Sequence, residues 1–234
     1  MSQVKYVYFF VATLFLINAI SLLIFIVSPG SGTVRGYFLN EDSLIETLSA
    51  GLFFGAFLLA FMLLAACNEK NQFHCRWLIL LLVFGTIGFL DELSFGERLF
   101  DLEMPELAGV KIDALHDFFN LTLTLIFKLI SHDQIFALLL ILIGFVLSIL
   151  GILKYGKRIW YASIKDGSFQ VSLIMLMFIA FIFSALLLDA ELLPFWGSRA
   201  LEEMFELNAA MALFTSCLVV YKLGINKIPY NRQL

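Results

Sequence analysis

The sequence predicts an all-α protein, a polytopic bundle of transmembrane helices that forms a single domain over residues 1–234. Hydrophobic residues make up 61% of the chain and charged residues only 15%. The mean hydropathy of +0.95 lies far outside the range of soluble globular domains. Several apolar runs also reach the roughly 20 residues that a helix needs to cross a hydrocarbon core of about 30 Å.

Six segments are predicted to span the membrane, because each is apolar over such a length. They cover about residues 6–28, 42–66, 77–97, 133–153, 171–193 and 200–222. A seventh apolar segment, about 114–130, is interrupted by His116, Asp117, Asn120 and Lys128. We therefore expect this segment to form an interfacial or re-entrant helix.

Basic residues predict the orientation of the spans, because Lys and Arg in short loops are retained in the cytoplasm. With both termini inside, ten of the 15 basic residues are cytoplasmic, including Arg76, Lys154 and Lys222. Of the 19 acidic residues, all except Glu69 and Asp166 then lie on or near the outer face. The sequence thus predicts an N-in, C-in integral protein of the bacterial cytoplasmic membrane, with its acidic residues facing outside.

Two carboxylates are predicted to lie at matching depth within this bilayer. Counted from Trp77 at the inner interface, Asp91 lies roughly 21 Å along its helix at a rise of 1.5 Å per residue. Counted from Tyr221, Glu206 lies at roughly 22 Å. A charge at such a depth costs about 2.5–3.5 kcal/mol on insertion scales, so a functional site is expected.

Further polar residues extend this acidic site. Glu46 in the second span, Glu92 beside Asp91, and Glu202 one turn before Glu206 are all expected to approach it. The imidazole of His116 is expected to serve this site as a nitrogen ligand or a proton shuttle. The predicted metal ligands are Glu46, Asp91, Glu92, His116, Glu202 and Glu206, and the predicted catalytic residues are Asp91, Glu92, Ser94 and His116.

Two arginines are the expected charge partners of these acids. Arg98 follows Asp91 at i+7, and Arg199 precedes Glu202 by three residues. Arg199 and Glu202 also fit an ordinary solvated helix start, where acidic residues complement the helix dipole. Asp91 and Glu92 do not fit that alternative, because they lie towards the C-terminal end of their predicted helix.

Small residues and cysteines carry two structural expectations. Gly51 and Gly55 are predicted to form a small face for close helix packing. The three cysteines, Cys67, Cys75 and Cys217, are too few for a disulfide framework, and we expect reduced thiols.

The acidic motifs together resemble a group of uncharacterised bacterial multi-span membrane proteins. The matching residues are 41–46, 91–100 with Pro105, His116 with Asn120, and 202–206. In that group the central motif runs Glu-Glu-Ile-Ser-Trp-Gly-Gln-Arg, and the resemblance implies no known activity. Leu90-Asp91-Glu92-Leu93 is similar to a stretch of alkaline ceramidases, although their zinc-binding histidine pair is replaced by Glu202 and Glu206. Asp91-Glu92 also resembles a feature of the VanZ-like glycopeptide-resistance proteins.

Three functions are consistent with these residues. The first is a metal-dependent hydrolase or transferase acting on a lipid or lipid-linked substrate, with Zn, Mg, Mn, Ca or Fe as the divalent ion. The second is a proton- or cation-coupled transporter or channel subunit. The third is a non-catalytic scaffold that binds a membrane protein partner or a second copy of the chain. The sequence contains no basic patch or glycine-rich phosphate loop, so no nucleic-acid partner is expected.

Overall fold

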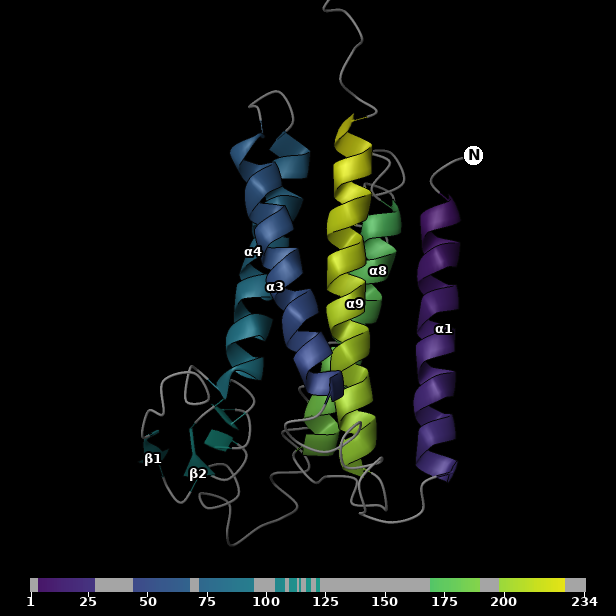
Figure 1. Ribbon diagram of the computed structural model, residues 1–234. Coiled ribbons are helices and arrows are strands. Elements are labelled where there is room, and N and C mark those ends of the chain that lie inside the picture. Colours follow the sequence, from purple (N-terminus) through teal and green to yellow (C-terminus); the bar gives the residue numbers. More distant parts are fainter. Residues whose placement is uncertain are drawn as a thin grey trace, which may run out of the picture.

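The chain forms a bundle of helices in the computed structural model, which describes residues 4–27, 44–67, 72–94, 104–107, 110–112, 114, 117–118, 121–122, 169–189 and 198–225. The helices run side by side along one axis (Figure 1). Their bounds are α1 Val4–Val27, α3 Leu44–Ala65, α4 Gln72–Glu92, α8 Phe169–Asp189 and α9 Ser198–Ile225. The predicted all-α class is confirmed for these residues.

Within the described residues, three helices are long and apolar enough to cross a membrane: Leu44–Ala65, Phe169–Asp189 and the Arg199–Leu223 part of α9. Large apolar side chains lie exposed on the outer surfaces of α3 and α8, including Met62 at 67% and Leu176 at 61% exposed. Such surfaces are compatible with a bilayer, because each helix forms its backbone hydrogen bonds internally and presents apolar side chains to lipid. The predicted membrane protein class is therefore supported by the fold.

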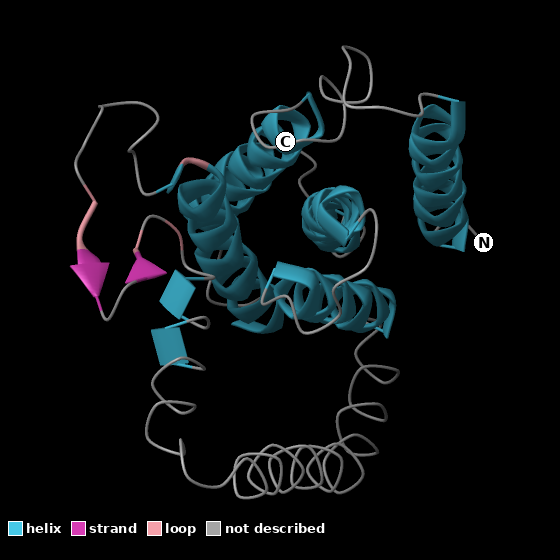
Figure 2. Cartoon of the chain, turned by 90° about the horizontal axis from the view of Figure 1, so that it is seen from below, coloured by secondary structure: helices cyan, strands magenta, loops and turns pink. Residues whose placement is uncertain are grey.

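Helix α9 lies at the centre of the bundle and contacts α1, α3, α4 and α8. Viewed along the bundle, the helix that carries the N-terminus, α1, stands at the edge (Figure 2). Residues 207–213 of α9 are all buried and rich in small side chains, with Ala209, Ala210 and Ala212 each 0% exposed. Small side chains let neighbouring backbones approach closely, which is how membrane helices gain packing energy without a hydrophobic driving force.

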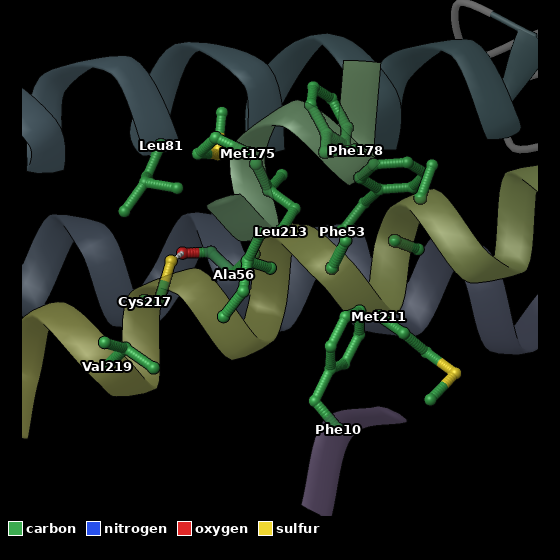
Figure 3. Close-up of a cluster of buried hydrophobic side chains, with 14 of the residues drawn as sticks. Phe10, Phe53, Ala56, Leu81, Met175, Phe178, Met211, Leu213, Cys217 and Val219 are labelled. Atoms are coloured by element: carbon green, nitrogen blue, oxygen red, sulfur yellow. Dashed lines mark hydrogen bonds between the residues drawn. The ribbon is translucent and has the colours of Figure 1, made fainter. Parts of the chain in front are cut away.

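The buried cluster draws on all five helices. Figure 3 shows its side chains, among them Phe10 of α1, Leu81 of α4 and Leu213 of α9. The Sγ of Cys217 donates a hydrogen bond to the backbone oxygen of Ala56 at 3.5 Å, linking α9 to α3.

Helices α3 and α4 form an antiparallel pair whose closest approach is at a glycine. A Cβ atom on Gly85 would lie 2.9 Å from the backbone nitrogen of Phe57, and one on Gly88 would lie 2.5 Å from the ring of Phe53. The predicted close packing is confirmed for Gly55, where a Cβ would meet the Phe214 ring at 3.2 Å. It is wrong for Gly51, around which the described residues leave 4 Å of open space.

The third predicted span ends earlier than expected. It was predicted to run to about residue 97, but α4 ends at Glu92. Two residues later, Ser94 has a φ of 49°, a left-handed conformation that often terminates helices. The turn at Ser94 therefore fixes the helix end directly after the two carboxylates.

The cysteine prediction is wrong for the first two thiols, which form a disulfide between Cys67 and Cys75. These residues lie after α3 and within the first turn of α4, and their Cα atoms are 6.1 Å apart. The α3–α4 hairpin brings them together, at the end of the bundle opposite the C-terminus of α4 (Figure 1). Cys217 is a free, buried thiol, as expected.

Some predicted elements lie outside the described residues. This applies to the span at about 133–153 and to most of the segment at about 114–130. Within that segment, residues 117–118 and 121–122 are helical, and the Ala114 N–H donates a hydrogen bond to Asp117 Oδ2 at 2.9 Å. A short antiparallel hairpin not predicted from the sequence, β1 Glu106–Leu107 and β2 Val110–Lys111, precedes it.

Candidate functional site

A cavity of about 480 Å³ lies among α3, α4, α8 and α9. Its volume falls within the roughly 300–1,000 Å³ typical of small-molecule sites. Most of its wall is aromatic or aliphatic. The lining residues are Phe53, Phe84, Ile87, Gly88, Asp91, Glu92, Phe178, Ile179, Ile182, Phe183, Leu186 and Glu206.

Three carboxylates from two helices share this cavity. Asp91 and Glu92 close the last turn of α4, and Glu206 lies two turns into α9. The C-terminal end of α4 and the N-terminal end of α9 lie at the same end of the bundle (Figure 1). The shared level of Asp91 and Glu206, deduced from residue counts along two separate spans, thus corresponds to one common cavity.

The carboxylates are close enough to influence one another electrostatically. Asp91, Glu92 and Glu206 line the same cavity, and Glu202 and Glu203 lie about one turn before Glu206 on α9. Like charges at short range in a site of low polarity are unfavourable unless they share protons or attract a cation. The site therefore favours carboxyl groups that share protons with one another, or a bound ligand with a positive charge.

Aromatic rings form the inner end of the cavity. The rings of Phe84 and Phe178 meet edge to face with their centroids 5.2 Å apart, and thus join α4 to α8. Phe84 precedes Asp91 by seven residues, which is roughly 10 Å along the helix. Phe53 and Phe178 also belong to the buried cluster in Figure 3. The cavity is consequently polar at one end and apolar along its length.

The side of the cavity between α4 and α8 carries exposed apolar side chains. Ile87 on α4 is 37% exposed, and Ile179 and Phe183 on α8 are 55% and 53% exposed. All three also line the cavity. Among the described residues, this side of the cavity is therefore bordered by exposed apolar groups.

Gly88 keeps space open beside the carboxylates. It lies on the turn directly before Asp91 and Glu92, and the ring of Phe53 occupies the volume that its Cβ would take. A larger residue at this position would push Phe53, which is itself part of the wall. Gly88 thus holds the wall where it is.

Other predicted site residues are not brought to the cavity wall. Glu46 is buried at 8% exposed, but it lies seven residues before Phe53 on α3. Since α3 is antiparallel to α4 and Phe53 meets Gly88, Glu46 lies roughly 10 Å further out, beyond the end of α4. Ser94 and Glu202 are partly buried outside the lining, and Arg199 is exposed. His116 and Arg98 lie outside the described residues.

The described carboxylates are too far apart to form a metal site of three side chains. Within the part of the chain that the structure describes, no three His, Cys, Asp or Glu side chains are grouped closely enough to hold a metal ion. The three cavity carboxylates therefore do not fit a metal site by themselves. The metal ligand set stays a prediction, and its one histidine, His116, lies outside the described residues.

The apolar part of the site was not predicted from the sequence. In a membrane helix, phenylalanine and isoleucine can face lipid, the helix core or a cavity. The residue types of Phe84, Phe178 and Ile182 therefore do not reveal that these side chains line a cavity. Their positions follow only from how α4 and α8 are placed around α9.

The fold and this site together define a helical membrane protein with an acidic, largely apolar cavity at one end of its bundle. No family model, no curated protein and no solved structure matches the chain.

Proposed function

We propose that the chain is an integral membrane enzyme, a hydrolase or transferase that acts on a lipid or lipid-linked substrate in this cavity. The observation that supports the proposal most directly is that Asp91, Glu92 and Glu206 line one cavity whose remaining wall is apolar. The apolar wall suits an acyl or prenyl chain, and the carboxylates lie where the polar part of such a molecule would be.

The carboxyl groups supply general acid and base catalysis. In its ionised form, one carboxylate accepts a proton from an attacking water or hydroxyl group, while a protonated neighbour donates a proton to the leaving oxygen or nitrogen. Neighbouring carboxyl groups share protons, so both forms coexist in one cluster. These steps use carboxyl groups alone. Of the other predicted metal ligands, Glu46 and Glu202 lie outside the cavity lining, and His116 lies outside the described residues.

The orientation belongs to the same proposal. We infer six spans and an N-in, C-in arrangement in a bacterial cytoplasmic membrane, with the carboxylates towards the outside. The start of α1, the α3–α4 turn and the end of α9 lie at one end of the bundle, opposite the carboxylates (Figure 1). This arrangement supports the orientation predicted from the basic residues.

Two observations favour an enzyme over the other functions. A transport path needs polar groups through the full depth, whereas this cavity ends at the rings of Phe84 and Phe178. A scaffold would direct its acids to different neighbours, whereas Asp91, Glu92 and Glu206 share one cavity.

A turnover assay tests the proposal. Purified protein in lipid nanodiscs is incubated with fluorescent analogues of phosphatidylethanolamine, phosphatidylglycerol, diacylglycerol and undecaprenyl phosphate, and products are separated by thin-layer chromatography. We expect turnover of at least one analogue, and a fall of about 100-fold or more in Asp91→Asn and Glu206→Gln, as loss of a general acid or base implies. Glu106→Gln in β1 is the matched control, because Glu106 is exposed and outside the lining.

The cavity itself is tested by filling it. Ile182→Trp places a larger side chain in the lining, while Leu176→Trp makes the same kind of change on the lipid-facing surface of the same helix. Turnover should fall only in the first variant. An absence of turnover with every analogue, or equal activity in all variants, would contradict the proposed function.

A further inference from the structure

The polar part of the cavity wall has a single charge sign. Among the described residues that line it, Asp91, Glu92 and Glu206 are acidic and none is basic. A phosphate or carboxylate head group would meet repulsion at this position, while a cationic group would be attracted. Charge complementarity with these lining residues thus favours a cationic head group over an anionic one at the level of the carboxylates.

Two aromatic rings lie towards the carboxylate end of the cavity. The Phe53 ring of α3 meets Gly88, one turn before Asp91, and Phe183 of α8 lines the wall five residues beyond Phe178. Phe84 and Phe178 lie at the inner end. The faces of aromatic rings attract cations within about 6 Å, and rings with acidic side chains are the usual recognition site for ammonium groups. The rings and the acids come from different elements, so they indicate the same ligand chemistry independently.

Access to this space is from the lipid. The lining residues Ile87, Ile179 and Phe183 are exposed between α4 and α8, where a bilayer would surround them. A molecule arriving there carries an alkyl chain that matches the apolar wall. Its ammonium group would then lie at the outer end, beside the carboxylates.

We propose that the cavity binds a cationic amphiphile, a molecule with an alkyl chain and an amine or quaternary ammonium head, as its preferred ligand class. This inference rests on the proposed function, since it names the substrate class of the same site. The head group is recognised by the carboxylates of Asp91, Glu92 and Glu206 together with the rings of Phe53 and Phe183. The chain occupies the space along Ile182 and Ile179, towards the rings of Phe84 and Phe178.

Photoaffinity labelling tests the inference. Three probes share one diazirine-bearing dodecyl chain and differ only in the head: trimethylammonium, sulfate or maltoside. Each is added to the full chain in nanodiscs of neutral lipid, and labelled peptides of α4 and α8 are quantified by mass spectrometry. We expect the ammonium probe to label these helices at least tenfold more than the sulfate probe, with the maltoside probe between them.

Variants separate charge recognition from occupancy of the cavity. In Asp91→Asn combined with Glu206→Gln, the ammonium preference should fall towards unity while maltoside labelling persists; in Glu106→Gln it should be unchanged. Ile182→Trp should reduce labelling by all three probes, and Leu176→Trp should not. Equal labelling by the ammonium and sulfate probes in the unmodified protein overturns the inference, but leaves the proposed function standing if Ile182→Trp still blocks labelling. Labelling that no cavity variant alters overturns both.

An Arg98→Ala variant tests whether the protein supplies its own cation. The ammonium preference should be present before this change and persist after it. A preference that appears only after the loss of Arg98 would mean that a guanidinium group occupies the head-group position, and would overturn the inference.

Discussion

Asn18 on α1 and Asn208 on α9 join their carboxamides by two reciprocal hydrogen bonds, with Nδ2 to Oδ1 distances of 3.0 and 3.1 Å. Asn208 is buried at 3% exposed, in the helix that also carries Glu206. Helix α1 stands at the edge of the bundle (Figure 2), and this pair is its polar attachment to α9 among the described residues. The same pair fixes the rotation of α1 about its own axis.

Replacing either amide should loosen α1. Asn18→Leu and Asn208→Leu are each expected to lower the free energy of unfolding by about 1 kcal/mol, the usual size of an interhelical polar contact in a membrane. The double variant should cost less than the sum, because it leaves no amide without its partner. Denaturation by SDS in mixed micelles measures all three.

Thr13→Val provides the control on the same helix. The Thr13 hydroxyl donates to the Phe9 backbone oxygen at 2.8 Å within α1 and does not reach across to another helix. Its replacement should change the free energy of unfolding by less than about 0.5 kcal/mol. Full additivity of Asn18→Leu and Asn208→Leu would show that the two amides act separately.

Two glycine-to-alanine changes should have opposite effects. Gly85→Ala forces a methyl group against the backbone of Phe57, 2.9 Å away, and should destabilise the α3–α4 pair by about 1–3 kcal/mol. Gly51→Ala meets no described atom within 4 Å and improves helix propensity, so it should stabilise by about 0.5–1 kcal/mol. Thermal unfolding in detergent compares them, and equal melting temperatures would contradict the packing at Gly85.

The carboxylate positions could be predicted from sequence because a helix rises by a constant amount per residue. Trp77 and Tyr221 mark an interface, and counting from each places Asp91 and Glu206 at one level without any tertiary information. The prediction was less successful for Glu46, because its depth depends on the register of α3 against α4. That register is set by Gly85 and Gly88, whose contacts depend on the partner helix.

The disulfide could have been predicted from the positions of its two cysteines along the chain. Cys67 and Cys75 flank the short turn between two antiparallel spans, and such a turn brings its flanks together. The number of cysteines argued against a framework but said nothing about a single local pair. The left-handed Ser94 was harder to foresee, because glycine is the residue expected at that position.

Ser94 should behave as a helix terminator. With φ at 49°, Ser94→Gly removes the steric cost of a left-handed residue and should stabilise the protein by about 1 kcal/mol. Ser94→Val should destabilise it, because a β-branched residue is strained in this conformation. Thermal unfolding measures the first effect against the second.

The same variants test the prediction that Ser94 is a catalytic residue. Because Ser94 is outside the cavity lining, turnover in the lipid assay should survive Ser94→Gly. Loss of turnover in a variant of raised stability would instead assign Ser94 the catalytic role predicted from the sequence.

The orientation of the bundle can be tested at the Cys67–Cys75 disulfide. Basic residues at this end, including the exposed Arg76, predict the cytoplasm, whereas disulfides are typical of oxidising compartments. We expect the basic residues to determine the orientation, because they act during insertion and a disulfide forms only afterwards.

Cys75→Ala frees the Cys67 thiol, which a membrane-impermeant maleimide should label in inside-out vesicles and not in right-side-out ones. Cys217 is 0% exposed and should stay unlabelled, so Cys67→Ala combined with Cys75→Ala is the blank. Labelling of Cys67 from the outer side would invert the bundle, and would turn Asp91, Glu92 and Glu206 towards the cytoplasm.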